Sequence, residues 1–151
     1  MTHVLLLTFD SIDLGVGHTQ VRELAQALAD RGIRVTVISF ENDKKYRSFN
    51  RSGASNPTWI RLRFGRFGPF GGISRVVRLA LRSRLVRKVD VIHCRGDLSF
   101  VAAAGRRAPR IWDMRAFWPQ QRVVTGALAE ESIAWRLMLR IQRYCYRRAH
   151  G

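Results

Sequence analysis

The chain has 151 residues, a length that suits one domain with a sizeable core. Its apolar fraction of 46% and charged fraction of 25% exclude a disordered chain, and no apolar run approaches the ~20 residues of a membrane-spanning helix. A net charge of +16 favours anionic partners, and the two cysteines, Cys94 and Cys145, are too few for a disulfide framework or a zinc site.

The first forty residues predict a strand, a glycine loop, a helix and a second strand. An apolar run over His3–Thr8 is typical of a buried strand, and Asp13–His18 follows as the loop. Apolar residues then recur at helical spacing over Thr19–Arg31, before the β-rich run Val35–Phe40. A helix between two such strands indicates a parallel sheet. Because the strand begins at the third residue, with no basic leader before it, we expect a cytoplasmic protein.

The same patterns continue to the end of the chain. Further strands are expected over Thr58–Phe64, Asp90–Cys94 and Arg110–Asp113, with helices over Ile73–Lys88, Leu98–Ala104 and Ser132–Ala149. Glu41–Pro57, Gly65–Gly72 and Phe117–Glu130 are interpreted as loops. This order predicts an α/β fold, a Rossmann-like doubly wound parallel sheet over residues 1–151. The last helix has no strand after it, so we interpret the chain end as a domain boundary or a truncation.

The third expected helix, Ile73–Lys88, carries both apolar residues and arginines at helical spacing. We assign to its inward face Ile73, Val76, Val77, Ala80 and Leu81, and to its outward face Arg75, Arg78 and Arg82. On the last helix, Ile133, Leu137, Ile141 and Tyr144 form one side and Arg136, Arg140, Arg143 and Arg147 form another.

The positive charge is unevenly distributed. From Lys44 to Val89 there is no acidic residue, although 13 lysines and arginines fall there. A bias toward arginine and ordinary solvated helix faces would account for this. An anionic membrane surface, an anionic substrate or a nucleic acid would account for it equally.

Polar or glycine-rich sequence follows three of the expected strands, whose carboxyl ends share one edge of a parallel sheet. The candidate site residues are Gly15, Gly17 and His18 after the first strand, His93, Arg95 and Asp97 at the fourth, and Asp113 and Arg115 at the fifth. Glycines and a helix N-terminus suit a phosphate or sugar hydroxyl, but a tight turn without a ligand fits too. His93 fits a hydrogen-bonded core histidine. Asp113 and Arg115 point the same way in an extended chain, as a salt bridge or as a base and a cation.

Three segments in order resemble the N-terminal domain of a GT-B fold glycosyltransferase of the retaining family 4. The first is V-L-L-L-T-F-D…G-V-G-H-T-Q-V-R-E-L-A-Q-A-L-A-D-R-G-I-R-V-T-V-I-S, and the second is D-V-I-H-C-R-G-D-L-S-F-V-A-A-A. The third, W-D-M-R-A-F-W-P-Q-Q-R-V-V-T-G, is similar to a subgroup that reads D-x-R-G-F-W-x-x-x-R. The resemblance covers essentially the whole chain.

The resemblance implies a two-domain enzyme, a hexosyltransferase that acts without an essential metal or other cofactor. Its N-terminal domain would bind a glycan or lipid-linked acceptor. A C-terminal domain, absent from residues 1–151, would bind the nucleotide-sugar donor. The fragment alone would therefore be inactive.

The resemblance also implies roles for individual residues. Gly15 and Gly17 match the loop that approaches the donor phosphates. Arg95 stands where many members carry the second histidine of an H-x-H pair. Arg115 stands where many carry the histidine of a T-x-H motif, with Asp113 in place of the threonine, and Ala116 departs from the subgroup's glycine. We assign Asp113 and Arg115 as catalytic and the other candidates as substrate-binding.

Two surface interactions are expected. Related enzymes that act on lipid-linked acceptors meet the membrane through basic and aromatic surface. We therefore expect peripheral contact with the inner face of an anionic membrane through the third-strand to third-helix region, including Phe67 and Phe70. An exposed sheet edge favours self-association.

Two other functions are open at this stage. In an NAD(P)-binding Rossmann domain of an oxidoreductase, Glu41 after the second strand would hold a ribose hydroxyl, although Gln20 occupies the third glycine position of that fingerprint. A nucleic-acid-binding protein would explain the net charge of +16, but no recognised binding motif accompanies the charge, so we expect no nucleic-acid partner.

Overall fold

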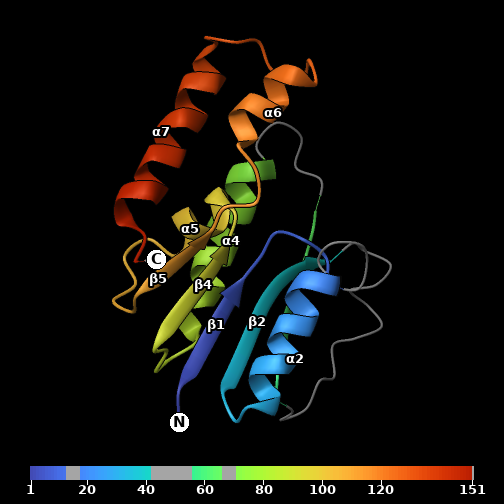
Figure 1. The fold of residues 1–151 in the computed structure, drawn as a ribbon, viewed down its shortest axis with the longest axis vertical. Helices are drawn as coiled ribbons and strands as arrows, with labels where there is room; N and C mark the ends of the chain where they lie inside the picture. Colours follow the sequence, from blue (N-terminus) through green and yellow to red (C-terminus); the bar gives the residue numbers. More distant parts are fainter. Residues whose placement is uncertain (13–17, 42–55, 66–70, 151) are drawn as a thin grey trace.

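The computed structural model describes residues 1–12, 18–41, 56–65 and 71–150. Within them the chain forms a five-stranded sheet of β1 (His3–Leu7), β2 (Arg34–Glu41), β3 (Thr58–Arg63), β4 (Val91–Arg95) and β5 (Arg110–Asp113). The strand order is β3-β2-β1-β4-β5, and every neighbouring pair is parallel (Figure 1). The predicted doubly wound parallel sheet is confirmed. Its strand order reverses between β1 and β4, where ligands bind in such sheets.

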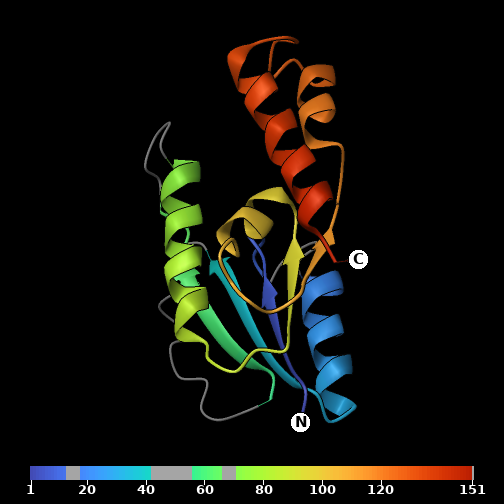
Figure 2. The same ribbon diagram turned by 90° about the vertical axis from the view of Figure 1, so that its left-hand side faces the viewer.

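Helices cover both faces of the sheet. They are the π-helical turn η1 (His18–Arg22) and the α-helices α2 (Glu23–Asp30), α4 (Gly71–Leu85), α5 (Asp97–Ala102), α6 (Trp118–Val124) and α7 (Ile133–Arg148). Figure 2 shows α2 on one side of the sheet and α4 on the other. Within the described residues, no helix combines the length and apolarity needed to cross a bilayer.

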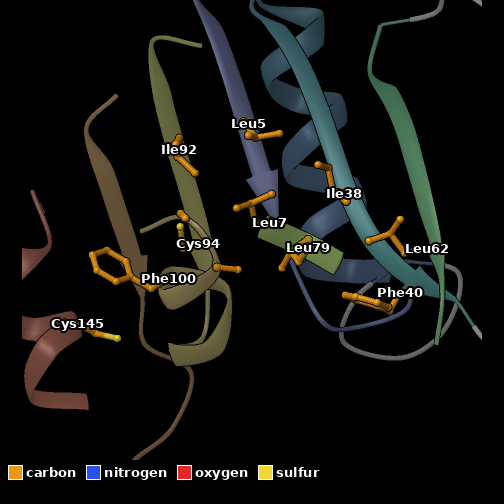
Figure 3. Packing of buried hydrophobic residues seen from close by; sticks show 12 residues of the cluster. Leu5, Leu7, Ile38, Phe40, Leu62, Leu79, Ile92, Cys94, Phe100 and Cys145 are labelled. Atoms are coloured by element: carbon orange, nitrogen blue, oxygen red, sulfur yellow. The ribbon is translucent and has the colours of Figure 1, made fainter. Parts of the chain in front are cut away.

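Two apolar clusters form the core because successive strand residues point to opposite faces. Leu5 and Leu7 of β1 pack with residues of α4, α5 and α7, among them Leu79, Phe100 and Cys145 (Figure 3). On the other face, a second cluster holds Leu6, Ile12, Val35 and Val37 against Val21 and Ala25. The sheet is therefore buried on both faces, as its nearly continuous apolar strands require.

The predicted orientation of α4 is partly wrong. Val76 and Ala80 do pack on the core, together with Leu79. Ile73, Val77 and Leu81, expected to face inward, are exposed instead. The helix carries apolar residues on two faces, so its sequence fits two rotations.

Four hydrogen bonds from arginines to backbone carbonyls fix that rotation. The Arg78 guanidinium donates to the carbonyls of Arg63 and Phe64, at 2.7 and 3.2 Å. Arg106 donates to the carbonyls of Ser83 and Val86, at 2.7 and 2.9 Å. Arg78, expected to face outward, is therefore turned toward β3.

The interpretation of Phe117–Glu130 as an irregular loop is also wrong. Its first part forms α6, with Pro119 buried in the first helical turn, where a proline is favourable because it has no N–H to satisfy. A helix this short is not stable by its own helix propensity, and α6 is stabilised by packing against α7. α7 begins as predicted, with the Ser132 hydroxyl accepting a hydrogen bond from the Trp135 N–H at 3.2 Å. The apolar residues in the N-terminal half of α7, Ile133 and Leu137, are exposed, whereas Ile141 and Tyr144 in its C-terminal half pack on the core.

The β5 edge of the sheet is partly covered near Arg110. The His150 N–H donates to the Arg110 carbonyl at 2.9 Å, and the Arg110 N–H donates to Nδ1 of His150 at 3.3 Å. These bonds pair backbone groups that a free edge strand would offer to another chain.

Candidate functional site

The turns after β1, β4 and β5 meet around the side chain of Arg95. Arg95 ends β4 and is 8% exposed. Its Nε lies 2.7 Å from Oδ2 of Asp10, and its Nη2 donates to Oε1 of Gln20 at 2.7 Å. Its Nη1 lies 3.7 Å from Oδ2 of Asp113, the residue opposite Arg95 in the register of β4 and β5. One buried guanidinium therefore joins η1 and the ends of three strands.

A single carboxylate oxygen, Oδ2 of Asp113, has three nitrogen-bearing neighbours. It lies 3.6 Å from Nε2 of His93, 3.7 Å from Nη1 of Arg95 and 3.5 Å from Nη1 of Arg115. The last contact confirms that Asp113 and Arg115 point the same way. Burial lowers the pKa of His93, and the charges of Arg95 and Arg115 lower it further, although Asp113 partly opposes them. The imidazole is therefore neutral at pH 7.

Asp97, the first residue of α5, is a buried carboxyl with one oxygen unpaired. The side chain is 8% exposed, and its Oδ1 accepts a hydrogen bond from Nε1 of Trp112 at 3.1 Å. Its Oδ2 is buried and has no hydrogen-bond partner in the described part of the chain. Burial raises the pKa of Asp97, and the bond from Trp112 only partly offsets this. Gly96, just before it, has a φ of +81°, a conformation that favours glycine and starts the sharp turn into α5.

A cleft of about 690 Å³ opens at the carboxyl ends of β1, β3, β4 and β5. Its lining comprises Phe9, Asp10, Phe64, Arg75, Arg95, Gly96, Asp97, Leu98, Arg115, Ala116, Trp118 and Gln121. Such a volume, with aromatic walls and a few convergent charged groups, is typical of small-molecule sites. Arg95, Asp97 and Arg115 line it, whereas His93 and Asp113 do not.

On its α4 side the cleft is lined by Arg75, which we expected from the sequence to lie on the outward face of the helix. The guanidinium carbon of Arg75 lies 4.3 Å from the centre of the Phe64 ring. Its Nε is buried and, within residues 1–12, 18–41, 56–65 and 71–150, has no hydrogen-bond partner. A donor at Arg75 and an acceptor at Asp97 are thus both left unpaired along one cleft.

The structure describes the positions of only some of the candidate site residues. His93, Arg95, Asp97, Asp113 and Arg115 gather at one edge of the sheet, as predicted from the strand ends. Gly15 and Gly17 lie outside the described residues. His18 begins η1, and only its backbone is described. Phe67 and Phe70 also lie outside the described residues.

Several cleft residues were missed from sequence. Asp10 lines the cleft and, like Gln20 beside it, accepts a hydrogen bond from Arg95, and no local pattern indicates a pairing between residues so distant in the chain. Trp118 and Gln121 belong to the segment interpreted as a loop. A signal did exist for Trp118, because aromatic residues beside strand ends are common in ligand sites.

Glu41, on which the NAD(P) alternative depended, is fully buried at the end of β2. Its carboxylate accepts hydrogen bonds from the Ser11 hydroxyl at 2.5 Å, the Ile12 N–H at 3.1 Å and the Ser39 hydroxyl at 2.9 Å. These bonds fix the segment after β1 and leave Glu41 unavailable to a ribose. Among the described residues, no group of three His, Cys, Asp or Glu side chains is arranged to hold a metal ion.

Comparison with known proteins gives one family. The model of Glycosyltransferase Family 4 matches residues 17–151. No curated protein sequence matches the chain. Among solved structures, a UGT transferase from Siraitia grosvenorii, crystallised in complex with UDP, is similar at 18% identity with a TM-score of 0.46. The match covers 74% of this chain and 27% of that one, so the chain spans about a quarter of that protein's length.

Proposed function

Because the chain belongs to glycosyltransferase family 4, we propose that residues 1–151 form the acceptor-binding half of a two-domain hexosyltransferase. The donor, a nucleotide-sugar, would bind to a second domain that faces the carboxyl edge of the sheet. The observation that carries this proposal is the cleft of about 690 Å³ at that edge, lined by Asp97, Arg115 and aromatic rings. This edge is where ligands bind in open parallel sheets.

The cleft has the chemistry to hold a sugar-like acceptor. Phe9, Phe64 and Trp118 offer aromatic surface for the apolar face of a sugar ring. Asp97 would accept a hydrogen bond from an acceptor hydroxyl through its unpaired oxygen. Because this oxygen is buried, the Asp97 side chain would have to turn toward the cleft to reach the acceptor. Arg75 on α4 would bind an anionic group of the acceptor.

Arg115 would stabilise the leaving group. In the transfer, the bond from the anomeric carbon to the diphosphate oxygen breaks and a bond from the acceptor oxygen forms. The acceptor proton passes to the departing phosphate oxygen, so no separate base is needed. Negative charge develops on the diphosphate, and a fixed cation lowers the energy of that state. Arg115 lines the cleft and is oriented by Asp113 at 3.5 Å.

The remaining candidates support this arrangement. We assign Arg95 as a positioning residue, because its guanidinium bonds to Asp10 and Gln20 hold the turns in register. Neutral His93 would leave Asp113 free to pair with the two arginines. From the family resemblance, Gly15, Gly17 and His18 belong to the loop that approaches the donor phosphates.

The test is sugar transfer by the full-length protein that contains this chain, followed as release of nucleoside diphosphate from UDP- and GDP-sugars. Arg115→Ala should lower kcat by roughly 100-fold, the usual effect of removing one group that stabilises developing charge. Arg136→Ala, an exposed arginine on α7, is the matched control and should leave kcat unchanged. Full activity of Arg115→Ala would disprove its role. Transfer by residues 1–151 alone would disprove the need for a second domain.

A further inference from the structure

The outward face of α4 carries an apolar stripe. Ile73, Val77, Leu81 and Leu85 follow one another at intervals of four residues, and they are between 50% and 68% exposed. Residues at this spacing lie on one side of a helix. A helix that covers a sheet normally presents polar residues to solvent, so this α4 stripe is unusual.

The stripe does not pack on the hydrophobic core of the domain. Leu79 and Ser83, the fully buried residues of α4, lie on the opposite side of the helix. The bonds from Arg78 and Arg106 to backbone carbonyls hold the helix in this rotation. Figure 2 shows α4 as the outermost layer on its side of the molecule. The stripe therefore faces away from the domain.

Positive charge borders the stripe without acidic neighbours in the sequence. Arg82, Arg84, Arg87 and Lys88 are exposed on α4 and the turn after it. From Lys44 to Val89 the sequence contains no Asp or Glu, and the first acid after it, Asp90, accepts a hydrogen bond from the His3 N–H. Apolar residues flanked by arginines are typical of helices that lie in a membrane interface.

We propose that the α4 stripe and its flanking arginines bind an anionic phospholipid bilayer, with α4 lying flat in the headgroup region. The four apolar side chains would enter the acyl boundary, and the cations would pair with lipid phosphates, at about 1 kcal/mol each. α4 belongs to the third-strand to third-helix region that we expected from the sequence to contact the membrane, and Phe67 and Phe70 of that region lie outside the described residues.

Charge and area both favour lipid over a second copy of the chain. Pairing of two copies through the stripe would bring two arginine-rich, acid-free surfaces together, on chains that each carry a net charge of +16. A stable protein interface also needs about 800 Å² and 20 to 30 residues per partner. The α4 stripe has four residues, whereas a bilayer has no such minimum.

Membrane contact through α4 has a consequence for the cleft. Arg75, on the first turns of the same helix, lines the cleft. Docking of α4 would bring the cleft close to the lipid surface, where a lipid-linked acceptor could enter it. This consequence rests on the proposed function, but binding to the bilayer does not.

The test is co-sedimentation of residues 1–151 with vesicles of phosphatidylcholine, with and without phosphatidylglycerol. The double variant Leu81→Gln/Leu85→Gln should lose about tenfold or more in affinity for anionic vesicles, as expected from two lost apolar insertions. The matched control is Ile133→Gln/Leu137→Gln, which removes two exposed apolar residues from α7, another arginine-rich helix. It should bind like the unchanged protein.

Three results would overturn the proposal: equal binding to neutral and anionic vesicles, the same loss in both double variants, or no loss in the α4 variant. A fourth such result would come from analytical ultracentrifugation: a dimer that the α4 substitutions convert to a monomer and the α7 substitutions do not. A second copy of the chain would then cover the stripe. Circular dichroism checks that both variants are folded. Sugar transfer to a soluble acceptor by the full-length protein should survive the α4 substitutions. A loss of this transfer would mean that Leu81 and Leu85 serve the proposed transferase site rather than the bilayer.

Discussion

Arg95 and Asp10 are joined by a contact of 2.7 Å between Nε and Oδ2, although they are 85 residues apart in the chain. Asp10 follows β1, and Arg95 ends β4, the neighbouring strand on the side where the strand order reverses. The arginine is almost completely buried, while half of the aspartate side chain is exposed. The edge of the sheet is therefore held by a desolvated cation whose partners come from three segments.

Replacing this cation should cost stability. Arg95→Ala leaves Asp113 without one of its cations and Gln20 without its donor, and we expect a loss of about 3–5 kcal/mol in the free energy of unfolding. Arg95→Lys should recover only part of it, because an ammonium cannot reproduce the forked contacts. Urea unfolding measures both. Arg136→Ala, exposed on α7, should stay within about 0.5 kcal/mol of the unchanged chain, and a similarly small effect of Arg95→Ala would contradict the arrangement.

The pKa of His93 should lie below the ordinary value of 6.5 and fall further in Asp113→Asn. Burial lowers this pKa, while the Asp113 charge raises it, so removing the charge leaves burial and the two arginines unopposed. NMR titration of the imidazole measures both values. A rise in Asp113→Asn would show that the contact of 3.6 Å does not persist in solution.

Stability should follow the same titration. Because the pKa in the folded state is lowered, the unfolded chain takes up a proton first as pH falls below 6.5. The contribution of neutral His93 is complete above pH 6.5 and is lost as pH falls through the folded-state pKa. His93→Gln should remove this part of the pH dependence in urea unfolding.

Asp97→Asn should separate stability from activity. Because burial raises the pKa of Asp97, its contribution is present below the ordinary value of 3.8 and is lost as pH rises through the folded-state pKa. The neutral amide should therefore stabilise the chain by about 1 kcal/mol at pH 7 and not at pH 3, since it keeps an oxygen for Trp112. Asp30→Asn, exposed at the end of α2 where its carboxylate accepts a hydrogen bond from Gln26, should change stability by less than about 0.5 kcal/mol at either pH.

The same substitution should weaken transfer if the unpaired oxygen accepts a bond from the acceptor. An Asp97→Asn enzyme that is more stable and less active would support a binding role, because natural sites often sacrifice stability for function. Unchanged activity would mean that Asp97 serves only the fold.

The fold was predictable from sequence wherever burial was complete. The runs around Leu5–Leu7, Val35–Phe40 and Ile92–Cys94 are apolar because both faces of the sheet are covered, and they fixed the strands and their parallel order. The rotation of α4 was not predictable, since Ile73, Val77 and Leu81 form as good an apolar face as Val76, Leu79 and Ala80.

The candidate site residues at the strand ends could be located from the sequence, whereas those that reach the site through long-range contacts could not. His93, Arg95, Asp113 and Arg115 follow directly from the rule that parallel strands share a carboxyl edge. Gln20 and Arg75 reach the site only after η1 and α4 pack beside it, and the partner of each side chain is set by tertiary structure. Asp97 was predicted by position, but its unpaired oxygen depends on how Trp112 packs.

Cys94 and Cys145 should be inert in the folded chain. Burial raises the pKa of each thiol from the ordinary value of 9.0 to about 12. Near pH 8 this leaves roughly a thousandfold fewer thiolates, the form that attacks a disulfide reagent. Ellman's reagent should therefore label neither cysteine within minutes in buffer and both of them in urea. Fast labelling of Cys145 alone, whose Sγ lies 3.7 Å from the Asp97 carbonyl, would show that α7 opens away from α5 and exposes the back of the cleft.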